Sequence, residues 1–74
     1  MTAAQKELLE KPVNDLSFSI DLKELLEFYK IDTLEIFVKK KIGYHRRKHG
    51  LTFQHELELF RFMKENGLRE WWNE

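Results

Sequence analysis

Residues 52–66 carry the strongest hydrophobic pattern of the chain and predict its longest helix. Apolar residues recur there at steps of three and four, as a central stripe widened on one side: Phe53, Leu57 and Phe60, then Leu59, Phe62 and Met63. This is the period of a helix that is buried over more than half of its circumference. Thr52 is a favourable N-cap and Gly67 a favourable residue just past the C-terminus, so both ends are specified locally.

Two shorter helices are expected upstream. Asp21 and Asp32 each stand three residues before a glutamate, Glu24 and Glu35, which is the spacing of a capping box. The residues expected to be buried are Leu22, Leu25, Leu26, Phe28 and Tyr29 in the first helix, and Leu34, Phe37, Val38 and Ile42 in the second.

The remaining segments are read as a helical turn, an extended segment and a connection. Residues 2–9 predict a short helical turn that Pro12 ends. Residues 13–20 alternate, with Leu16, Phe18 and Ile20 on one side, and predict a short extended segment. Gly43 and Gly50 are expected to bracket a tight basic connection. The expected fold is all-α: one domain of four to five short helices over residues 11–74, after an N-terminal arm or short helix over residues 1–10.

Composition excludes several classes of protein. The 74 residues contain no cysteine, so there is no disulfide framework or thiolate site. No apolar run is long enough to span a membrane, and the first ten residues lack the apolar core of a secretory signal, so we expect a soluble, cytoplasmic protein. His45 and His49 have the spacing of a metal pair, but three neighbouring cations would repel a metal ion. With no glycine-rich phosphate loop either, we expect no cofactor, no metal and no enzymatic activity.

Charge is distributed unevenly although the net charge is zero. Residues 39–50 hold six of the 13 basic residues and no acid, which leaves seven basic and 13 acidic residues elsewhere. Phosphate binding needs several cations that follow a charged backbone, and tyrosine can stack on an unpaired base. The candidate nucleic-acid-binding residues are Lys39, Lys40, Lys41, Tyr44, Arg46, Arg47, Lys48 and His49. The competing interpretations are a solvated basic loop and a site for an acidic protein.

An alternative surface for a protein partner combines acids with tryptophans. Asp21, Glu24 and Glu27 lie on the expected first helix, and Trp71 and Trp72 lie near the C-terminus. Tryptophan is enriched at binding hot spots, but it also offers the largest apolar surface for packing a core. The sequence leaves both interpretations open.

Residues 11–68 follow the pattern of a known family. The pattern is carried by the entry Lys11-Pro12-Val13-Asn14-Asp15-Leu16, by Ser17 to Ile20, by Leu25, Leu26, Ile31, Leu34 and Val38, and by the closing Asn66-Gly67-Leu68. In these residues the chain resembles the C-terminal domain of the bacterial RNA polymerase alpha subunit. The resemblance implies a compact helix-hairpin-helix (SAM-like) domain that acts in transcription, binds DNA through the minor groove and contacts transcription factors.

The chain departs from this family at the DNA-contact positions. Where the family has an arginine and an asparagine on its first helix, this chain has Asp21 and Glu24. Where the family has a leucine-glycine-lysine-lysine-serine turn, this chain reads from Leu51 to His55 as Leu-Thr-Phe-Gln-His. We therefore expect a non-enzymatic binding module whose partner is DNA, another nucleic acid or a transcription-related protein, contacted through a different surface. The oligomeric state stays open.

Overall fold

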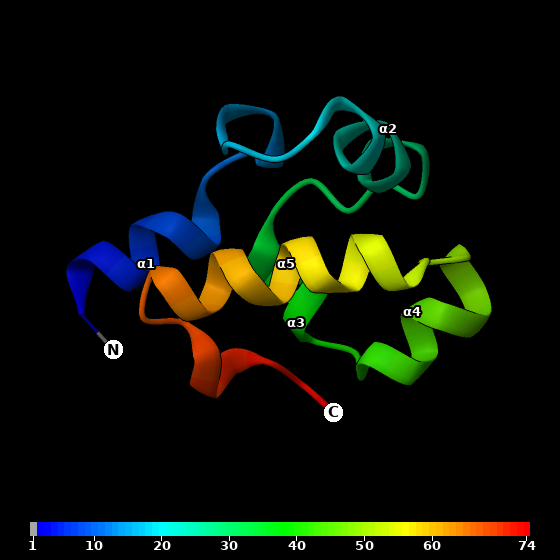
Figure 1. Ribbon diagram of the computed structural model, residues 1–74. Helices are drawn as coiled ribbons and strands as arrows, with labels where there is room; N and C mark the ends of the chain where they lie inside the picture. The colour runs from blue at the N-terminus through cyan, green and yellow to red at the C-terminus, as the bar shows by residue number, and fades with distance from the viewer. Residues whose placement is uncertain (1) are drawn as a thin grey trace. The chain divides into compact units, whose positions relative to one another are not determined.

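The structure is a computed structural model that describes residues 2–74, and in this part of the chain it is helical and has no strand (Figure 1). The all-α class is therefore confirmed. The helices are α1 (Ala3–Glu10), α2 (Ile20–Phe28), α3 (Leu34–Val38), α4 (Ile42–His49) and α5 (Phe53–Glu65), with 3₁₀ turns η1 (Val13–Asp15) and η2 (Arg69–Trp71). The chain divides into two compact units, Met1–Phe37 and Val38–Glu74. The expected domain boundaries stay a prediction.

The first unit begins with α1, which confirms the helical turn expected there. The Thr2 and Gln5 side chains form a reciprocal capping box: Thr2 Oγ1 accepts from the Gln5 N–H at 3.1 Å, and Gln5 Oε1 accepts from the Thr2 N–H at 2.9 Å. The helix ends at Glu10 because Lys11, which precedes proline, is extended. The Val13 N–H then donates to the Asp32 carbonyl at 2.9 Å, which ties the entry segment to the connection before α3.

Three expectations in the first unit are wrong in whole or in part. Of the extended segment expected over residues 13–20, residues 13–15 form a 3₁₀ turn and Ile20 is 75% exposed as the first residue of α2, whereas Leu16 and Phe18 are buried as expected. Ser19, not Asp21, caps α2, since its Oγ accepts from the Leu22 N–H at 3.2 Å. Thr33, not Asp32, caps α3, since its Oγ1 accepts from the Ile36 N–H at 3.3 Å. In both cases a hydroxyl one or two residues from the expected aspartate accepts from a backbone N–H in the first turn of the helix.

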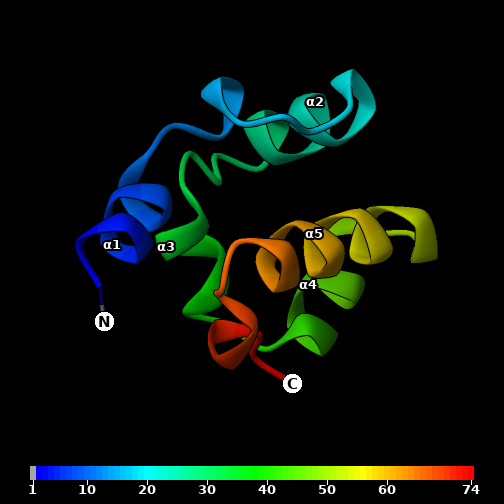
Figure 2. The same ribbon diagram turned by 60° about the vertical axis from the view of Figure 1, so that its left-hand side comes forward.

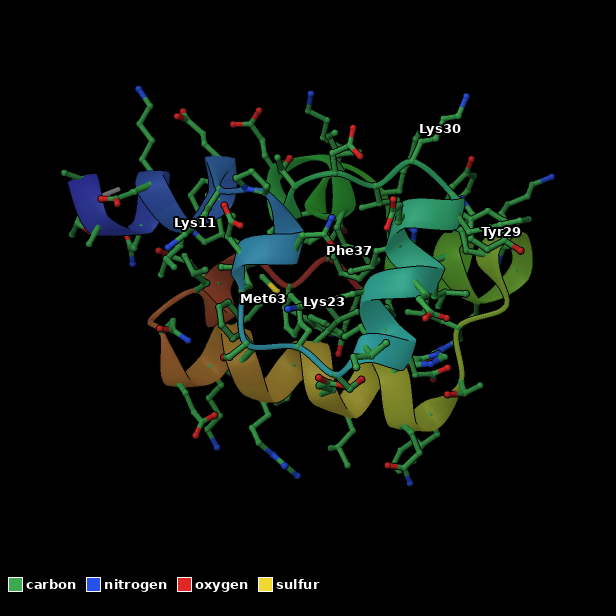
Figure 3. The ribbon with its side chains drawn as sticks, turned by 90° about the horizontal axis from the view of Figure 1, so that it is seen from above. Lys11, Lys23, Tyr29, Lys30, Phe37 and Met63 are labelled. Carbon is green, nitrogen blue, oxygen red and sulfur yellow. The ribbon has the colours of Figure 1, made fainter. Side chains whose placement is uncertain are left out.

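The C-terminus of α2 closes on a residue that is not glycine. Lys30 has φ 60°, and Figure 3 shows it at the end of the helix. The Ile31 N–H donates to the Leu26 carbonyl at 2.8 Å and the Lys30 N–H to the Glu27 carbonyl at 3.0 Å, which is the Schellman pattern. Ile31 and Leu26 are buried, so this apolar contact holds Lys30 in a backbone conformation that lysine disfavours.

The second unit contains α4, α5 and a C-terminal segment that turns back after α5 (Figure 2). Helix α5 begins and ends as the sequence predicts. Thr52 Oγ1 accepts from the His55 N–H at 3.2 Å, and His55 Nδ1 accepts from the Thr52 N–H at 3.3 Å. At the other end Gly67 has φ 73°, and the Leu68 N–H donates to the Met63 carbonyl at 2.7 Å. Leu68 is fully buried and covers the last turn.

Only part of the stripe expected on α5 is buried. Leu59 and Met63 are buried as expected, and His55 joins them at the same spacing of four residues. The expected centre of the stripe is wrong, because Phe53 is 72% and Leu57 37% exposed. Helix α5 has apolar residues on two sides, and periodicity alone does not say which side packs. Phe28 on α2 is likewise 76% exposed rather than buried.

The basic stretch is a helix rather than a tight connection. Residues 39–41 separate α3 from α4, and Arg46, Arg47 and Lys48 lie on α4 with Gly43 inside it. Gly50, with φ 61°, ends α4 and so closes the basic stretch, although the stretch itself is helical. Ile42 therefore opens α4 instead of extending the stripe of α3.

Helix α4 depends on the C-terminal segment for its start. Lys41 offers no side-chain cap, and the Ile42 N–H donates instead to the Asn73 carbonyl at 2.7 Å. The Asn73 side-chain amide donates to the carbonyl of Val38, the last residue of α3, at 3.1 Å. One residue near the C-terminus thus satisfies backbone groups on both sides of the Lys39–Lys41 segment.

Candidate nucleic-acid interface

The six predicted phosphate-binding cations are all exposed in the second unit. Three lie in the segment before α4 and three on α4: Lys39, Lys40 and Lys41, then Arg46, Arg47 and Lys48. Because α4 places successive residues about 100° apart, the three cations on it fan around the helix rather than share one line. The Arg47 guanidinium lies back over Gly43, where a Cβ would be 3.6 Å from Nη1.

Arg46 is committed to an ion pair. Its Nε and Nη2 donate to the two carboxylate oxygens of Glu56 on α5, at 2.7 and 2.6 Å. The hydrogen bond to Glu56, and then its charge, raise the pKa of Arg46, so the guanidinium stays ionised. Arg46 therefore joins α4 to α5, and its charge is neutralised locally. Within residues 2–74 none of the other five cations forms an ion pair.

Tyr44 packs between a lysine and two imidazoles. The Lys40 ammonium lies 5.4 Å from the centroid of the Tyr44 ring. The ring meets those of His45 and His49 edge to face, each at 5.7 Å. Tyr44 is half-buried, so part of the ring is accessible beside the cations.

The two histidines of α4 contact each other. His45 is buried, and its Nδ1 lies 3.0 Å from Nδ1 of His49, so one ring donates to the other. Burial lowers the pKa of His49, which favours the neutral ring at neutral pH. The neutral ring of His49 therefore adds no charge to the basic surface at that pH. Its contact with His45 joins two residues of α4 that lie one turn apart. In the described chain no group of three His, Asp or Glu side chains is arranged to hold a metal ion.

A groove beside the ion pair was not anticipated from the sequence. It has a volume of about 220 Å³ and is lined by Arg46, Phe53, Glu56, Leu57, Phe60, Trp72 and Glu74. The Phe60 and Trp72 rings meet edge to face with centroids 5.2 Å apart, and Trp72 Nε1 donates to Glu74 Oε1 at 3.1 Å. The expected centre of the buried stripe on α5, Phe53, Leu57 and Phe60, therefore lines this groove. One feature of the sequence could have indicated the groove: α5 carries more apolar residues than a single buried side requires.

The alternative surface is divided between the two units. Asp21, Glu24 and Glu27 are exposed on α2 of the first unit. Trp71 and Trp72 belong to the second unit, where both are half-buried. Only Trp72 lines the groove; the Trp71 indole nitrogen is buried and has no hydrogen-bond partner among residues 2–74.

No protein-family model matches the chain, and no curated protein or solved structure matches it significantly. Across residues 2–74, no helix has both the length and the apolar character that crossing a membrane requires.

Proposed function

We propose that this chain is a non-enzymatic nucleic-acid-binding module that contacts phosphates through the basic surface of residues 39–48. The observation that supports the proposal is the exposure of five cations that form no ion pair within residues 2–74: Lys39, Lys40, Lys41, Arg47 and Lys48. Such a surface attracts any polyanion and reads no base sequence directly. Tyr44, held beside Lys40, supplies an aromatic face next to the cations.

The role in transcription rests on the resemblance to the RNA polymerase alpha C-terminal domain. In that family the first helix contacts DNA, and the corresponding positions here, Asp21 and Glu24, are exposed acids on α2. Acids at these positions would repel phosphate, so the proposal assigns nucleic-acid contact to α4 and the segment before it. DNA in the bacterial cytoplasm is the target that the resemblance favours.

A charge-removal experiment tests the proposal. Arg47→Ala combined with Lys48→Ala should weaken binding to any sequence, because phosphate contacts are lost. The slope of log affinity against log salt concentration should fall by about 0.9 per lost contact on duplex DNA and by about 0.7 on a single strand. Fluorescence anisotropy titrations at several salt concentrations measure both quantities.

The matched control removes charge from α2. Asp21→Ala combined with Glu24→Ala should leave binding unchanged or improve it, because negative charge is lost. Absence of binding by the wild type at low salt, where attraction is least screened, would refute the nucleic-acid function. Loss of binding in the α2 variant alone would place the site on α2.

The Arg46–Glu56 pair offers a test of opposite sign. Glu56→Gln removes the carboxylate that neutralises Arg46, so one more cation becomes available to phosphate. Binding should tighten, and the salt slope should steepen by up to about 0.9 on duplex DNA. Arg46→Ala should lower affinity less than Arg47→Ala. The reverse order would show that Arg46 contacts phosphate despite its ion pair.

The second candidate function is a protein-interaction module. It is favoured by the position of Trp72 on the groove and by the three exposed acids on α2: Asp21, Glu24 and Glu27. Under this alternative, a pull-down with wild-type protein should capture a partner that a Trp71→Ala, Trp72→Ala variant loses. Retention of the partner by that variant would exclude the tryptophans as its site.

A further inference from the structure

We infer that the groove on α5 accepts unpaired bases, so that the ligand of this chain is a single strand rather than a duplex. The inference rests on the proposed function, because it assumes that phosphates follow the basic surface beside the groove. It adds the class of nucleic acid and a second set of contacts.

The aromatic side chains of the groove supply stacking faces. Phe53, in the first turn of α5, is 72% exposed, although burying a phenylalanine is ordinarily favourable. The Phe60 and Trp72 rings meet edge to face, with an interplanar angle of 81° and centroids 5.2 Å apart. The guanidinium carbon of Arg69 lies 5.4 Å from the centroid of the Phe60 ring, so Phe53 offers the more accessible face. Exposed aromatic rings beside cations are what proteins use to bind single strands, since every base has a flat face that can stack.

The charges around the groove separate bases from phosphates. Glu56 and Glu74 line the groove with Arg46, so it holds one more acid than base and disfavours a phosphate inside it. Outside it, α4 continues with Arg47 and Lys48, which are exposed and form no ion pair within residues 2–74. An uncharged base therefore suits the groove, while its phosphate suits the neighbouring cations.

A duplex cannot use this arrangement, because its bases are already stacked and paired inside the helix. It would contact only the cations. The groove volume of about 220 Å³ suits a small number of planar groups rather than a folded domain. The charge complementarity of α4 favours a polyanion over a neutral apolar peptide as the occupant.

The experiment compares Phe53→Ala with Phe28→Ala. Phe28 is 76% exposed on α2 and does not line the groove, so the two variants lose similar exposed side chains. Anisotropy is measured with a labelled oligothymidylate and with a random-sequence duplex of equal length. Wild type should bind the single strand more tightly. Phe53→Ala should lose roughly tenfold in single-strand affinity, which corresponds to about 1.4 kcal/mol. Its duplex affinity, and both affinities of Phe28→Ala, should be unchanged.

A second variant probes the charge argument. Glu74→Gln removes a negative charge and keeps an oxygen that can accept from Trp72 Nε1. Single-strand affinity should rise in this variant, because the remaining charge of the groove becomes neutral. A fall in affinity would contradict the separation of bases from phosphates.

The possible failures are distinguishable. If Phe53→Ala binds the single strand like wild type while the Arg47, Lys48 variant loses affinity, bases do not enter the groove and the basic-surface function stands. If neither nucleic acid binds wild type, both proposals fail. If sedimentation shows self-association that Phe53→Ala abolishes while single-strand affinity is unchanged, the groove binds a second copy of the chain and the inference is overturned.

Discussion

Helices α4 and α5 lie in the same unit and are separated by three residues, but they are specified in different ways. Helix α5 carries its own start in Thr52 and its own end before Gly67, and it is the most amphipathic stretch of the chain. Helix α4 has a local end at Gly50 but no side-chain cap at its start, and its only buried residues are Ile42 and His45. The first N–H of α4 is satisfied by Asn73.

This difference separates the helix that stabilises the second unit from the helix that carries its basic surface. A helix that is specified locally can hold a core on one side and leave another side available, as α5 does with Phe53 and Leu57. Helix α4 packs through two buried residues, Ile42 and His45, and its other positions can carry cations. Such a helix needs contacts from distant residues to hold it in place. The basic surface therefore depends on the C-terminal segment for its position.

The largest expected effect contrasts the two sides of α5. Leu59 is fully buried, so Leu59→Ala should lower the free energy of unfolding by about 2–5 kcal/mol. Phe53→Ala should change it by less than about 0.5 kcal/mol, because the side chain is 72% exposed. Phe60 is half-buried, and its replacement by alanine should fall between these values. Urea unfolding of the three variants gives this order. Equal losses for Leu59→Ala and Phe53→Ala would show that α5 is oriented differently.

The next effect contrasts the starts of the two helices. Thr52→Ala removes the cap of α5 and should cost about 1 kcal/mol. Asn73→Ala removes the side-chain hydrogen bond to the Val38 carbonyl and keeps the backbone carbonyl that accepts from the Ile42 N–H, but that carbonyl is then held less firmly in place. The change should cost about 0.5–1.5 kcal/mol, with the loss of order concentrated in α4. Amide hydrogen exchange distinguishes them, because exchange should accelerate in α5 for the first variant and in residues 39–49 for the second. If amide exchange in Asn73→Ala accelerates only in the last residues of the chain, the start of α4 does not depend on the Asn73 side chain.

The smallest effect concerns the imidazole pair of α4. The pKa of His49 is lowered by burial below its ordinary value of 6.5, so the unfolded chain binds a proton more readily than the folded one. The contribution of His49 to stability is therefore complete above about pH 6.5 and is lost as the pH falls through the window below it. Thermal unfolding between pH 7.5 and 5, at about half-unit steps, should show this loss. His49→Gln should flatten the profile, and an unchanged profile would assign the pH dependence to other groups.

The sequence by itself determined the features that short-range chemistry controls. Thr52 and Gly67 specify the ends of α5 because a hydroxyl reaches a nearby N–H and because glycine adopts positive φ without a clash. The helical class follows from periodicity, and the cluster of cations in residues 39–50 is a property of composition. The cap residues were missed by one or two positions where a serine or threonine stood near an aspartate.

Only the tertiary structure decided which surfaces are exposed and which charges are neutralised. Nothing local indicates that Leu59 and Met63 pack while Phe53 and Leu57 line a groove, since both pairs are apolar and spaced by four. The pairing of Arg46 with Glu56 joins residues on two helices, and the start of α4 depends on Asn73, far along the chain. Such contacts arise from the folded positions of distant residues, because the free energy of packing and pairing depends on neighbours that local sequence does not specify.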